Sequence, residues 1–311
     1  MDRYESMRIF TAVADARSFA AAARQLGLSA PAVSRAVVAL EEHLGAQLLR
    51  RTTRSVTLTE AGARYHGDCK RILADIAAAE ASATGAHVLP QGELTVTAPL
   101  MFGRIHVAPL LVEFLAAHPA IRARGLYSDH IVHLLDEGID VALRIARLPD
   151  SGLTAIRLGH VRRVVVASPA YLAQHGTPRS PDDLGRHSLI GYAAGATTTP
   201  WEFWPPGRRG RRDRILVEPS TRFTTNSNET AITAALSGHG LARSLSYQVA
   251  ADVAAGRLRV VLQEYEPAPI PVQIVHAGGR RPPAKVKVFV EFAAERLRRE
   301  PVLNGRFAWP P

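Results

Sequence analysis

The residues whose types and spacing could do chemistry lie in the first sixty positions, and that chemistry is the binding of phosphates and base edges. Arg50, Arg51 and Arg54 stand within five residues, and between residues 17 and 59 six arginines are balanced only by Glu41 and Glu42. Guanidinium groups bind phosphate oxygens in a bidentate fork, and such a local excess of positive charge suits a nucleic-acid backbone. The formal net charge of the chain is +10, but residues 1–90 hold eleven Lys and Arg against nine Asp and Glu. The overall charge is therefore not the evidence for nucleic acid.

Two short apolar-faced helices that meet at Gly27 would position this basic segment. Ala23 lies four residues before the glycine and Val33 six residues after it. A small residue lets two helices approach, glycine permits the tight turn, and valine fills the crossing. Ser29 is a suitable N-cap for the second helix, and Pro31 stands in its first turn, where a missing N–H costs nothing. The pattern is that of a helix-turn-helix.

The second helix divides into an inward and an outward face. Its apolar residues recur at spacings of four and three and make one inward stripe of Val33, Val37, Leu40 and Leu44. Ser34, Arg35 and Val38 are left outside, where they would face a DNA groove. A first helix over about 4–14 completes this small core, through Met7, Phe10 and Val13 or through Ile9 and Val13.

A wing and a long helix follow. Residues 48–58 are typical of two short strands around a basic turn, which would place the three arginines beside the second helix, near phosphates or a minor groove. Thr59 then caps a helix that runs to about Ala83. Its apolar residues indicate a coiled-coil seam, with packing on its own domain as the alternative: Tyr65, Cys69, Ile72, Ile76, Ala79 and Ala83. Cys69, the only cysteine, is interpreted as a small packed side chain rather than a redox sensor.

Beyond a hinge at about 83–92, strands and helices alternate. The expected strands are 94–98, 121–127, 139–145, 161–167, 189–192, 215–217, 223–225, 241–244 and 272–277, and the expected helices are 102–117, 131–136, 169–175, 227–236, 247–255 and 284–298. Such alternation predicts an α/β architecture with mainly parallel sheets. An arginine cluster within this region is interpreted as a solvated hairpin tip, with a second nucleic-acid patch as the alternative: Arg208, Arg209, Arg211, Arg212 and Arg214.

Open α/β sheets bind ligands beyond the carboxyl ends of their strands, and three loops of this chain stand there. The loops cover 98–102, 127–129 and 225–228, and each precedes a helix whose N-terminus offers free N–H groups and a positive dipole end. Arg144 and Arg147 follow a strand that should end at the same rim. We therefore expect a small anionic ligand, although Arg144 could instead pair with Asp129 or Glu137. The candidate ligand-binding residues are Pro99, Leu100, Met101, Phe102, Tyr127, Ser128, Arg144, Arg147, Asn226 and Ser227.

No catalytic or metal centre emerges from the residues. The chain contains no Gly-x-Ser-x-Gly elbow, phosphate loop or His-Glu-x-x-His motif, so we expect neither enzyme activity nor a cofactor. His130 and His133 stand beside Asp129, but two ligands without a convergent third make a weak metal site. The N-terminus has no cationic region followed by an apolar stretch, and no eighteen apolar residues run together. We expect a soluble cytoplasmic protein without a membrane partner.

With these elements in this order, the chain resembles LysR-type transcriptional regulators over nearly its whole length. Residues 21–27, 32–35, 40–41, 58–62, 134–144 and 235–242 carry the resemblance. It implies an all-α winged helix-turn-helix at 1–59, a linker or dimerisation helix and hinge at 60–91, and an effector-binding domain at 92–311 that resembles periplasmic solute-binding proteins. That domain would have two α/β lobes, at about 92–160 with 268–300 and at about 161–267, and a small-molecule inducer in the cleft.

The resemblance also implies partners and contacts. Such bacterial regulators dimerise through the linker helix, assemble as tetramers and bend double-stranded promoter DNA in response to the inducer, and RNA polymerase is a candidate partner. Pro31, Ser34 and Arg35 match recognition-helix residues that contact DNA, although Arg35 could contact a phosphate without reading a base. Arg54 matches a wing arginine that reaches the minor groove. Many relatives carry Gln where this chain has Ala30, which puts an adenine contact in doubt. The candidate DNA-binding residues are Ser29, Ala30, Pro31, Ser34, Arg35, Arg50, Arg51 and Arg54.

Two other classes of protein would need features that these residues do not supply. A solute-binding protein with an incidental helical N-terminus would need a signal peptide, and an enzyme with a DNA-binding appendage would need catalytic residues.

Overall fold

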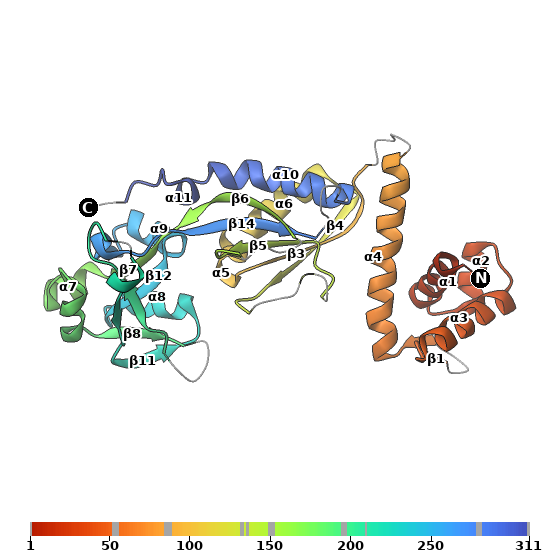
Figure 1. Ribbon diagram of the computed structural model, residues 1–311, viewed down its shortest axis with the longest axis horizontal. Helices are drawn as coiled ribbons and strands as arrows, with labels where there is room; N and C mark the ends of the chain where they lie inside the picture. Colours follow the sequence, from red (N-terminus) through yellow and green to blue (C-terminus); the bar gives the residue numbers. More distant parts are fainter. Residues whose placement is uncertain are drawn as a thin grey trace. The chain divides into compact units, whose positions relative to one another are not determined.

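The structure is a computed structural model of the chain, and it describes residues 2–51, 56–83, 89–130, 134, 137–148, 153–193, 198–208, 210–277 and 282–309. The chain forms two compact units, one made mainly of Met1–Gln91 and the other mainly of the residues from Gly92 onward. Figure 1 labels most of the helices and strands of both units.

Three helices build the core of the N-terminal unit: α1 (Arg3–Ala16), α2 (Phe19–Leu26) and α3 (Ala30–Leu44). Phe10 and Val13 of α1 pack against α2 and α3 and have no exposed surface, and Ile9 is buried beside them. Gly27 ends α2 with φ 67°, in the left-handed region that favours glycine. The helix-turn-helix predicted from the sequence is confirmed.

The inward stripe of α3 ends one turn earlier than predicted. Val33, Val37 and Leu40 are buried, but Leu44 is 40% exposed, so its place in the stripe was wrong. Ala36, only 1% exposed, joins the buried face instead. Leu44 is the last residue of the helix before the Gly45 cap, so its turn lies beyond the three-helix core.

The long helix α4 (Glu60–Ala83) begins at the predicted cap, because the Oγ1 of Thr59 accepts the N–H of Gly62 at 2.9 Å. Its first half packs on α1. Cys69 has no exposed surface within the helix-turn-helix core, and the ring of Tyr65 lies 5.5 Å from that of Phe10. Tyr65 and Cys69 thus pack on their own domain, which was the alternative to a coiled-coil seam. Ile72, one turn further on, is 36% exposed.

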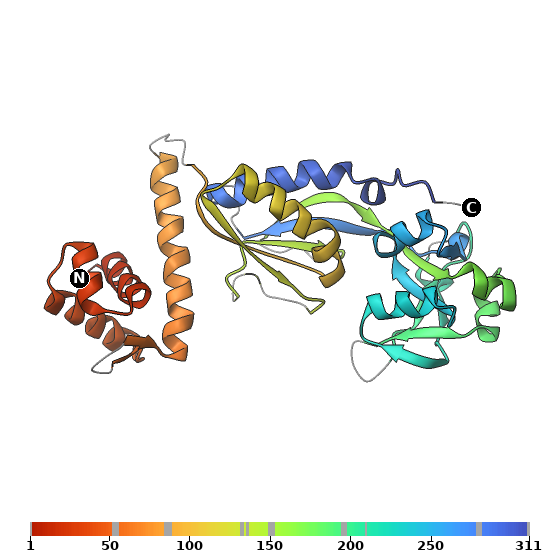
Figure 2. The same cartoon turned by 180° about the vertical axis from the view of Figure 1, so that it is seen from behind.

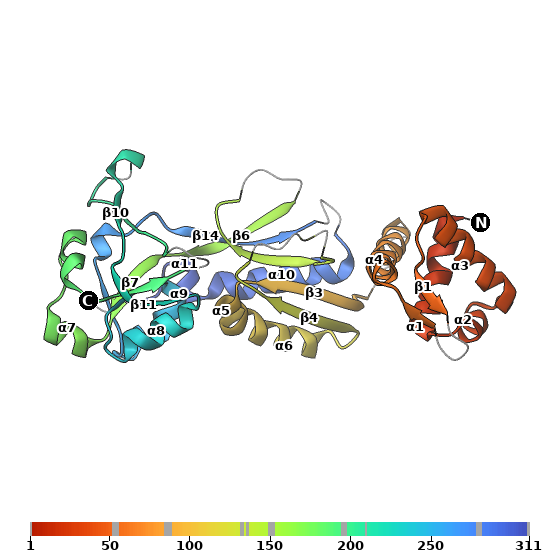
Figure 3. The ribbon, with the colours of Figure 1, turned by 90° about the horizontal axis from the view of Figure 1, so that it is seen from below.

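Two α/β lobes form the C-terminal unit, each around a five-stranded sheet. The first sheet has the order β4-β3-β5-β14-β6, formed by β3 (Gly92–Ala98), β4 (Ile121–Tyr127), β5 (Val141–Ile145), β6 (Thr154–Val161) and β14 (Ile270–His276). The second has the order β11-β8-β12-β7-β13, formed by β7 (Arg163–Ala167), β8 (Leu189–Tyr192), β11 (Thr221–Thr225), β12 (Leu241–Leu245) and β13 (Arg259–Val261). A separate antiparallel pair, β9 (Trp201–Phe203) and β10 (Ile215–Val217), extends from the second lobe in Figure 3.

Both large sheets are mixed, which corrects the prediction of mainly parallel sheets. In the first sheet β3 runs parallel to β4 and β5, but β14 runs antiparallel to β5 and β6. In the second, β8 runs parallel to β11 and β12, but β7 runs antiparallel to β12 and β13. The first reversal has a topological cause: β6 leads out of the first lobe and β14 leads back into it. The sequence prediction missed β6 altogether, and a single residue, Arg162, separates it from β7.

Helices cover the sheets. In the first lobe, α6 (Ala108–Ala117) and α10 (Ala284–Arg299) lie side by side, as Figure 2 shows, and Phe114 meets Phe289 edge to face at 5.1 Å between ring centroids. The other α-helices of this unit among the described residues are α5 (Leu100–Phe102), α7 (Pro169–His175), α8 (Asn228–Leu236), α9 (Ser246–Ala254) and α11 (Pro301–Asn304). The predicted helix at 131–136 lies largely outside the described residues.

The single helix predicted over 102–117 is interrupted by a π-helical turn, Gly103–Val107, between α5 and α6. Pro109 explains the wider turn, because proline lacks the N–H that would bond to Ile105 and its ring crowds that carbonyl. In length and apolar composition the stretch Leu100–Ala117 could cross a membrane. Its Phe102, Val107 and Phe114 have no exposed surface and belong to the core of the unit, which is the pattern of a core helix.

Candidate nucleic-acid interface and effector site

The outward face of α3 presents a short polar edge at the start of the helix. The Oγ of Ser29 accepts the N–H of Ala32 at 3.3 Å and so caps the helix. Ala30, Pro31 and Arg35 are exposed. These residues lie on the side of α3 away from its buried face, where a partner can reach them.

Ser34 and Val38 also belong to this outward edge of α3. Ser34 is half-buried. Val38, one helical turn after Ser34, is 38% exposed. The Nε of Arg35 donates to the carbonyl of Pro31 at 3.4 Å, a long bond that leaves the two terminal nitrogens of the guanidinium for other acceptors.

The wing consists of β1 (Leu49–Arg51) and β2 (Val56–Leu58), which pair antiparallel. Arg50 is exposed and stands opposite Thr57. The side chain of Arg51 and the whole of Arg54 lie outside the part of the chain that the structure describes. The minor-groove contact of Arg54 therefore stays a prediction.

Glu41 ties the wing to α3. One carboxylate oxygen, Oε1, accepts the N–H of Leu48 at 2.7 Å and that of Leu49 at 2.9 Å. Both leucines are buried, at 2% and 1% exposure. From the sequence, Glu41 was a compensating charge and part of a stretch that carries the family resemblance; in the structure it also positions the basic strand.

The predicted helix N-termini of the effector site are already occupied by side chains of the chain itself. The Oδ1 of Asp129 accepts the N–H of Leu100 at 3.0 Å, at the start of α5. Ser227 caps α8 by accepting the N–H of Thr230 at 3.3 Å. Fewer free N–H groups therefore remain for an anion at these two loops than the sequence suggested.

The other predicted ligand-binding residues divide between core and surface. Met101 and Phe102 are 7% and 0% exposed and pack in the core, behind Pro99 and the 53% exposed Leu100. The ring of Tyr127 covers Gly103 so closely that any side chain there would clash. Burial raises the pKa of the Tyr127 hydroxyl.

Polar residues occupy the rest of the predicted rim. Ser128 donates its N–H to the carbonyl of Ala98 at 3.0 Å, while Asn226 is exposed in the bend before α8. Arg144 lies on β5, opposite Gln273 of β14.

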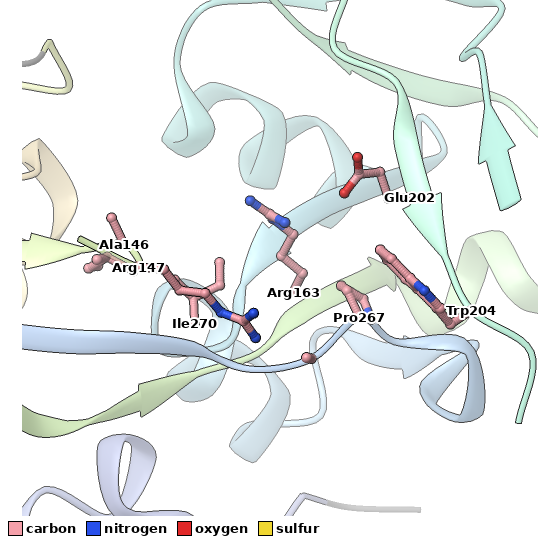
Figure 4. Close-up of a pocket in the computed structure, with 9 residues that line it drawn as sticks. Ala146, Arg147, Arg163, Glu202, Trp204, Pro267 and Ile270 are labelled. Carbon is pink, nitrogen blue, oxygen red and sulfur yellow. The ribbon is translucent and has the colours of Figure 1, made fainter. Parts of the chain in front are cut away.

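A cavity of about 450 Å³ lies where the chain crosses between the lobes (Figure 4). Its polar walls are Arg147, just after β5, Arg163 at the start of β7, and Glu202 and Trp204 of the β9 region. Ile145, Ala146, Pro267, Ala268 and Ile270 supply the apolar wall. The structure thus brings Arg147, but none of the other nine predicted residues, to this cavity. Arg163, Glu202 and Trp204 come from distant parts of the chain, and no local pattern in the sequence marks them.

Among the residues that the structure describes, two ion pairs connect the lobes. Arg104 of the π-helical turn reaches Glu229 at the start of α8, with a distance of 3.0 Å between Nη2 and Oε1. At the crossing itself, Arg162 binds Glu266 in a bidentate pair of 2.7 and 2.6 Å and lies 4.9 Å from the ring of Trp309. The pair joins the segment that leaves the first lobe to the segment that returns to it.

Within the part of the chain that the structure describes, no group of three His, Cys, Asp or Glu side chains could hold a metal ion. His133, one of the two histidines considered from the sequence, lies outside that part.

A winged helix-turn-helix joined to two α/β lobes with a cavity between them defines a DNA-binding regulator with a ligand-binding domain. Residues 4–63 match the model of bacterial regulatory helix-turn-helix proteins of the lysR family, and residues 87–298 match the LysR substrate binding domain. The chain belongs to the LysR family. It is a transcriptional regulator with a DNA-binding helix-turn-helix and an effector-binding domain.

Known relatives match it over nearly its full length. The HTH-type transcriptional regulator CrgA of Neisseria meningitidis serogroup C is 36% identical over 294 residues, which cover 94% of this chain and 96% of CrgA. The regulator PtxR of Pseudomonas aeruginosa is 34% identical over 292 residues, 94% of this chain and 92% of PtxR.

Solved structures agree on the fold. The structure of CrgA superposes with a TM-score of 0.59 at 34% identity and covers 96% of this chain and 99% of that one. Full-length LysG from Corynebacterium glutamicum, solved with the bound effector Arg, gives a TM-score of 0.55 at 21% identity, over 95% of this chain and 99% of LysG.

Proposed function

We propose that α3 of this chain enters the major groove of promoter DNA and that Ser29, Ala30, Pro31, Ser34 and Arg35 form its contact edge. The observation that carries the proposal is the division of α3 into a fully buried face and an exposed edge at its N-terminal end. A helix fits the major groove of B-DNA, and a helix-turn-helix places the first residues of its second helix at the base edges.

The wing supplies the phosphate contacts. Arg50 and Arg51 lie on the first wing strand, Arg54 follows them in the sequence, and Glu41 anchors that strand to the recognition helix. Positive charge at this position suits a phosphate backbone or a narrow minor groove.

The effector binds between the lobes of the C-terminal unit and changes the affinity for promoter DNA. We divide the chain accordingly into a DNA-binding domain at 1–59, a linker at 60–91 and an effector domain at 92–311, with lobes at about 92–160 and 268–300 and at about 161–267. The exposed Ile72 of α4 supports dimerisation through the linker helix, and the dimers assemble as tetramers. The promoter target places the protein in the cytoplasm.

A gel-shift experiment with the region upstream of the gene tests the DNA contact. Arg35→Ala should weaken specific binding by roughly 1 to 3 kcal/mol and relax the sequence preference at one base pair if Arg35 reads a base. Uniform weakening of specific and random duplex would indicate a phosphate contact instead. Arg259→Ala, an exposed arginine on β13, is the control for the loss of one positive charge and should bind as the unaltered protein does. Unchanged binding by Arg35→Ala would contradict the proposed contact edge.

A further inference from the structure

Arginines gather in excess at the cavity between the lobes. A second cavity of about 300 Å³ adjoins the first, because Arg163 and Glu202 line both. Arg214 and Arg243 line the second cavity, and Arg147 lines the first. Figure 4 shows the side chains of Arg147, Arg163 and Glu202 around the first cavity.

The one carboxylate among these lining residues is already engaged. The Oε1 of Glu202 accepts a hydrogen bond from Nη1 of Arg214 at 2.9 Å. Within the described residues, neither Arg147 nor Arg163 forms an ion pair, and Arg243 donates to a neutral group, the carbonyl of Pro200, at 2.7 Å. Among the described residues, the guanidinium groups of Arg147 and Arg163 are thus left without a carboxylate partner, and the charge of Glu202 acts on Arg243 only from beyond ion-pair distance.

Arg243 shows the electrostatic cost of this arrangement. Burial, with a contribution from the nearby charge of Arg163, lowers the pKa of Arg243 to about 10, while the charge of Glu202 opposes the shift. Positive charges that repel one another in a partly buried place destabilise the free protein, and a bound anion would relieve the repulsion.

We propose that this double cavity is the effector subsite and that it selects a small dianion, a dicarboxylate or a phosphate, over a monoanion of the same body. The inference rests on the proposed function, because it assigns the chemistry of the effector. Each arginine presents a planar fork that matches the two oxygens of one carboxylate or phosphate, so two unpaired forks call for two charges. The ring of Trp204 gives the body of the ligand an apolar wall, and its orientation is fixed by a hydrogen bond from Nε1 to the carbonyl of Gly210 at 3.1 Å.

The position of the cavity connects binding to conformation. Arg147 stands two residues after the end of β5 in the first lobe, and Arg163 is the first residue of β7 in the second. A dianion held by both arginines would link the lobes, whereas a monoanion would engage only one of them. A ligand shifts a conformational equilibrium only by its differential affinity for the two states, and a link between lobes supplies that difference.

The first experiment needs no ligand. In the full chain, Arg163→Gln should raise the midpoint of thermal unfolding at low salt, because it removes one of the repelling charges. The matched control Arg259→Gln removes an exposed charge on β13 of the same sheet and should leave the midpoint unchanged. A fall in the midpoint for Arg163→Gln would show that Arg163 has a structural partner and would overturn the inference.

The second experiment titrates phthalate, benzoate and inorganic phosphate into the full chain and follows tryptophan fluorescence. Trp204→Phe identifies the part of the signal that arises at the cavity. Phthalate should bind at least about tenfold more tightly than benzoate, and Arg163→Gln should abolish that difference, while Arg259→Gln keeps it. A response to phosphate as strong as the response to phthalate would assign the site to phosphate, and a weaker response would assign it to dicarboxylates.

Three results would overturn the inference: equal affinity for phthalate and benzoate, a preference that survives Arg163→Gln, or no response to either dianion at about 10 mM. Gel-shifts on the same preparation separate this outcome from the failure of the proposed function. Specific promoter binding without any response to dianions would refute only the dianion subsite. Loss of specific promoter binding would refute the proposed function itself.

Discussion

Replacing Glu41 by alanine should remove the hydrogen bonds that hold the wing against α3. The substitution removes the acceptor of two backbone N–H groups, those of Leu48 and Leu49, whose residues are almost fully buried. Each buried donor left unsatisfied costs about 1 to 3 kcal/mol. Two donors are affected, but the site is only partly buried and water can satisfy part of the lost bonding. We therefore expect the free energy of unfolding of the N-terminal unit to fall by about 2 to 4 kcal/mol.

Glu41→Gln separates the hydrogen bonds from the charge. Both N–H groups bind the same oxygen, so a glutamine can keep both bonds through its amide oxygen, with a weaker neutral acceptor and a loss of about 1 kcal/mol. The neighbour Glu42 is exposed, and Glu42→Ala should change stability by less than about 0.5 kcal/mol.

Urea unfolding with two spectroscopic probes distinguishes the units. The three tryptophans, Trp201, Trp204 and Trp309, all lie in the C-terminal unit, whereas far-ultraviolet circular dichroism also follows the helices of the N-terminal unit. Glu41→Ala should shift a circular-dichroism transition and leave the fluorescence transition in place. An unchanged circular-dichroism curve, or an equal effect of Glu42→Ala, would refute the reasoning.

Three more predictions concern other parts of the molecule. Burial lowers the pKa of His106 to about 4, whereas in the unfolded chain the imidazole takes up its proton near pH 6.5. The contribution of the neutral, buried His106 to the free energy of unfolding is therefore fully present above pH 6.5. It is lost as the pH falls towards 4, by up to about 3 kcal/mol. Compared with the unaltered protein, His106→Gln should show a shallower decline of the unfolding midpoint over this interval, and identical slopes would contradict the assignment. Glu266→Gln breaks the partly buried pair with Arg162 and should lower the free energy of unfolding by about 2 kcal/mol in the fluorescence transition, with the circular-dichroism change of the N-terminal unit unaffected. Burial raises the pKa of Cys69 to about 11, so iodoacetamide at pH 8 should modify it only in urea; rapid modification of the folded protein would show that the thiol is accessible.

The helix-turn-helix could be predicted because its determinants are local. Gly27 supplies the turn, Ser29 the cap, and the residues of α3 alternate between core and surface with the period of a helix. Leu44 was misplaced because the period continues to the end of the helix while the core against which it packs does not.

Features that depend on distant segments could not be predicted in the same way. The first sheet is mixed because β6 and β14 cross between the lobes in opposite directions, and the composition of neither strand indicates which strand it pairs with. The candidate effector site has the same character. Arg147 was found because it follows a strand, but Arg163 and Glu202 meet it only through the fold of the whole unit.

The most direct test of the central claim, that this chain reads DNA sequence through α3, is a competition experiment by fluorescence anisotropy. Purified protein is bound to a labelled fragment of its own upstream region at moderate salt and challenged with unlabelled upstream or random duplex. We predict that the upstream fragment competes far more strongly than random duplex, and that Arg35→Ala narrows this difference. Equal competition by the two duplexes would contradict the account.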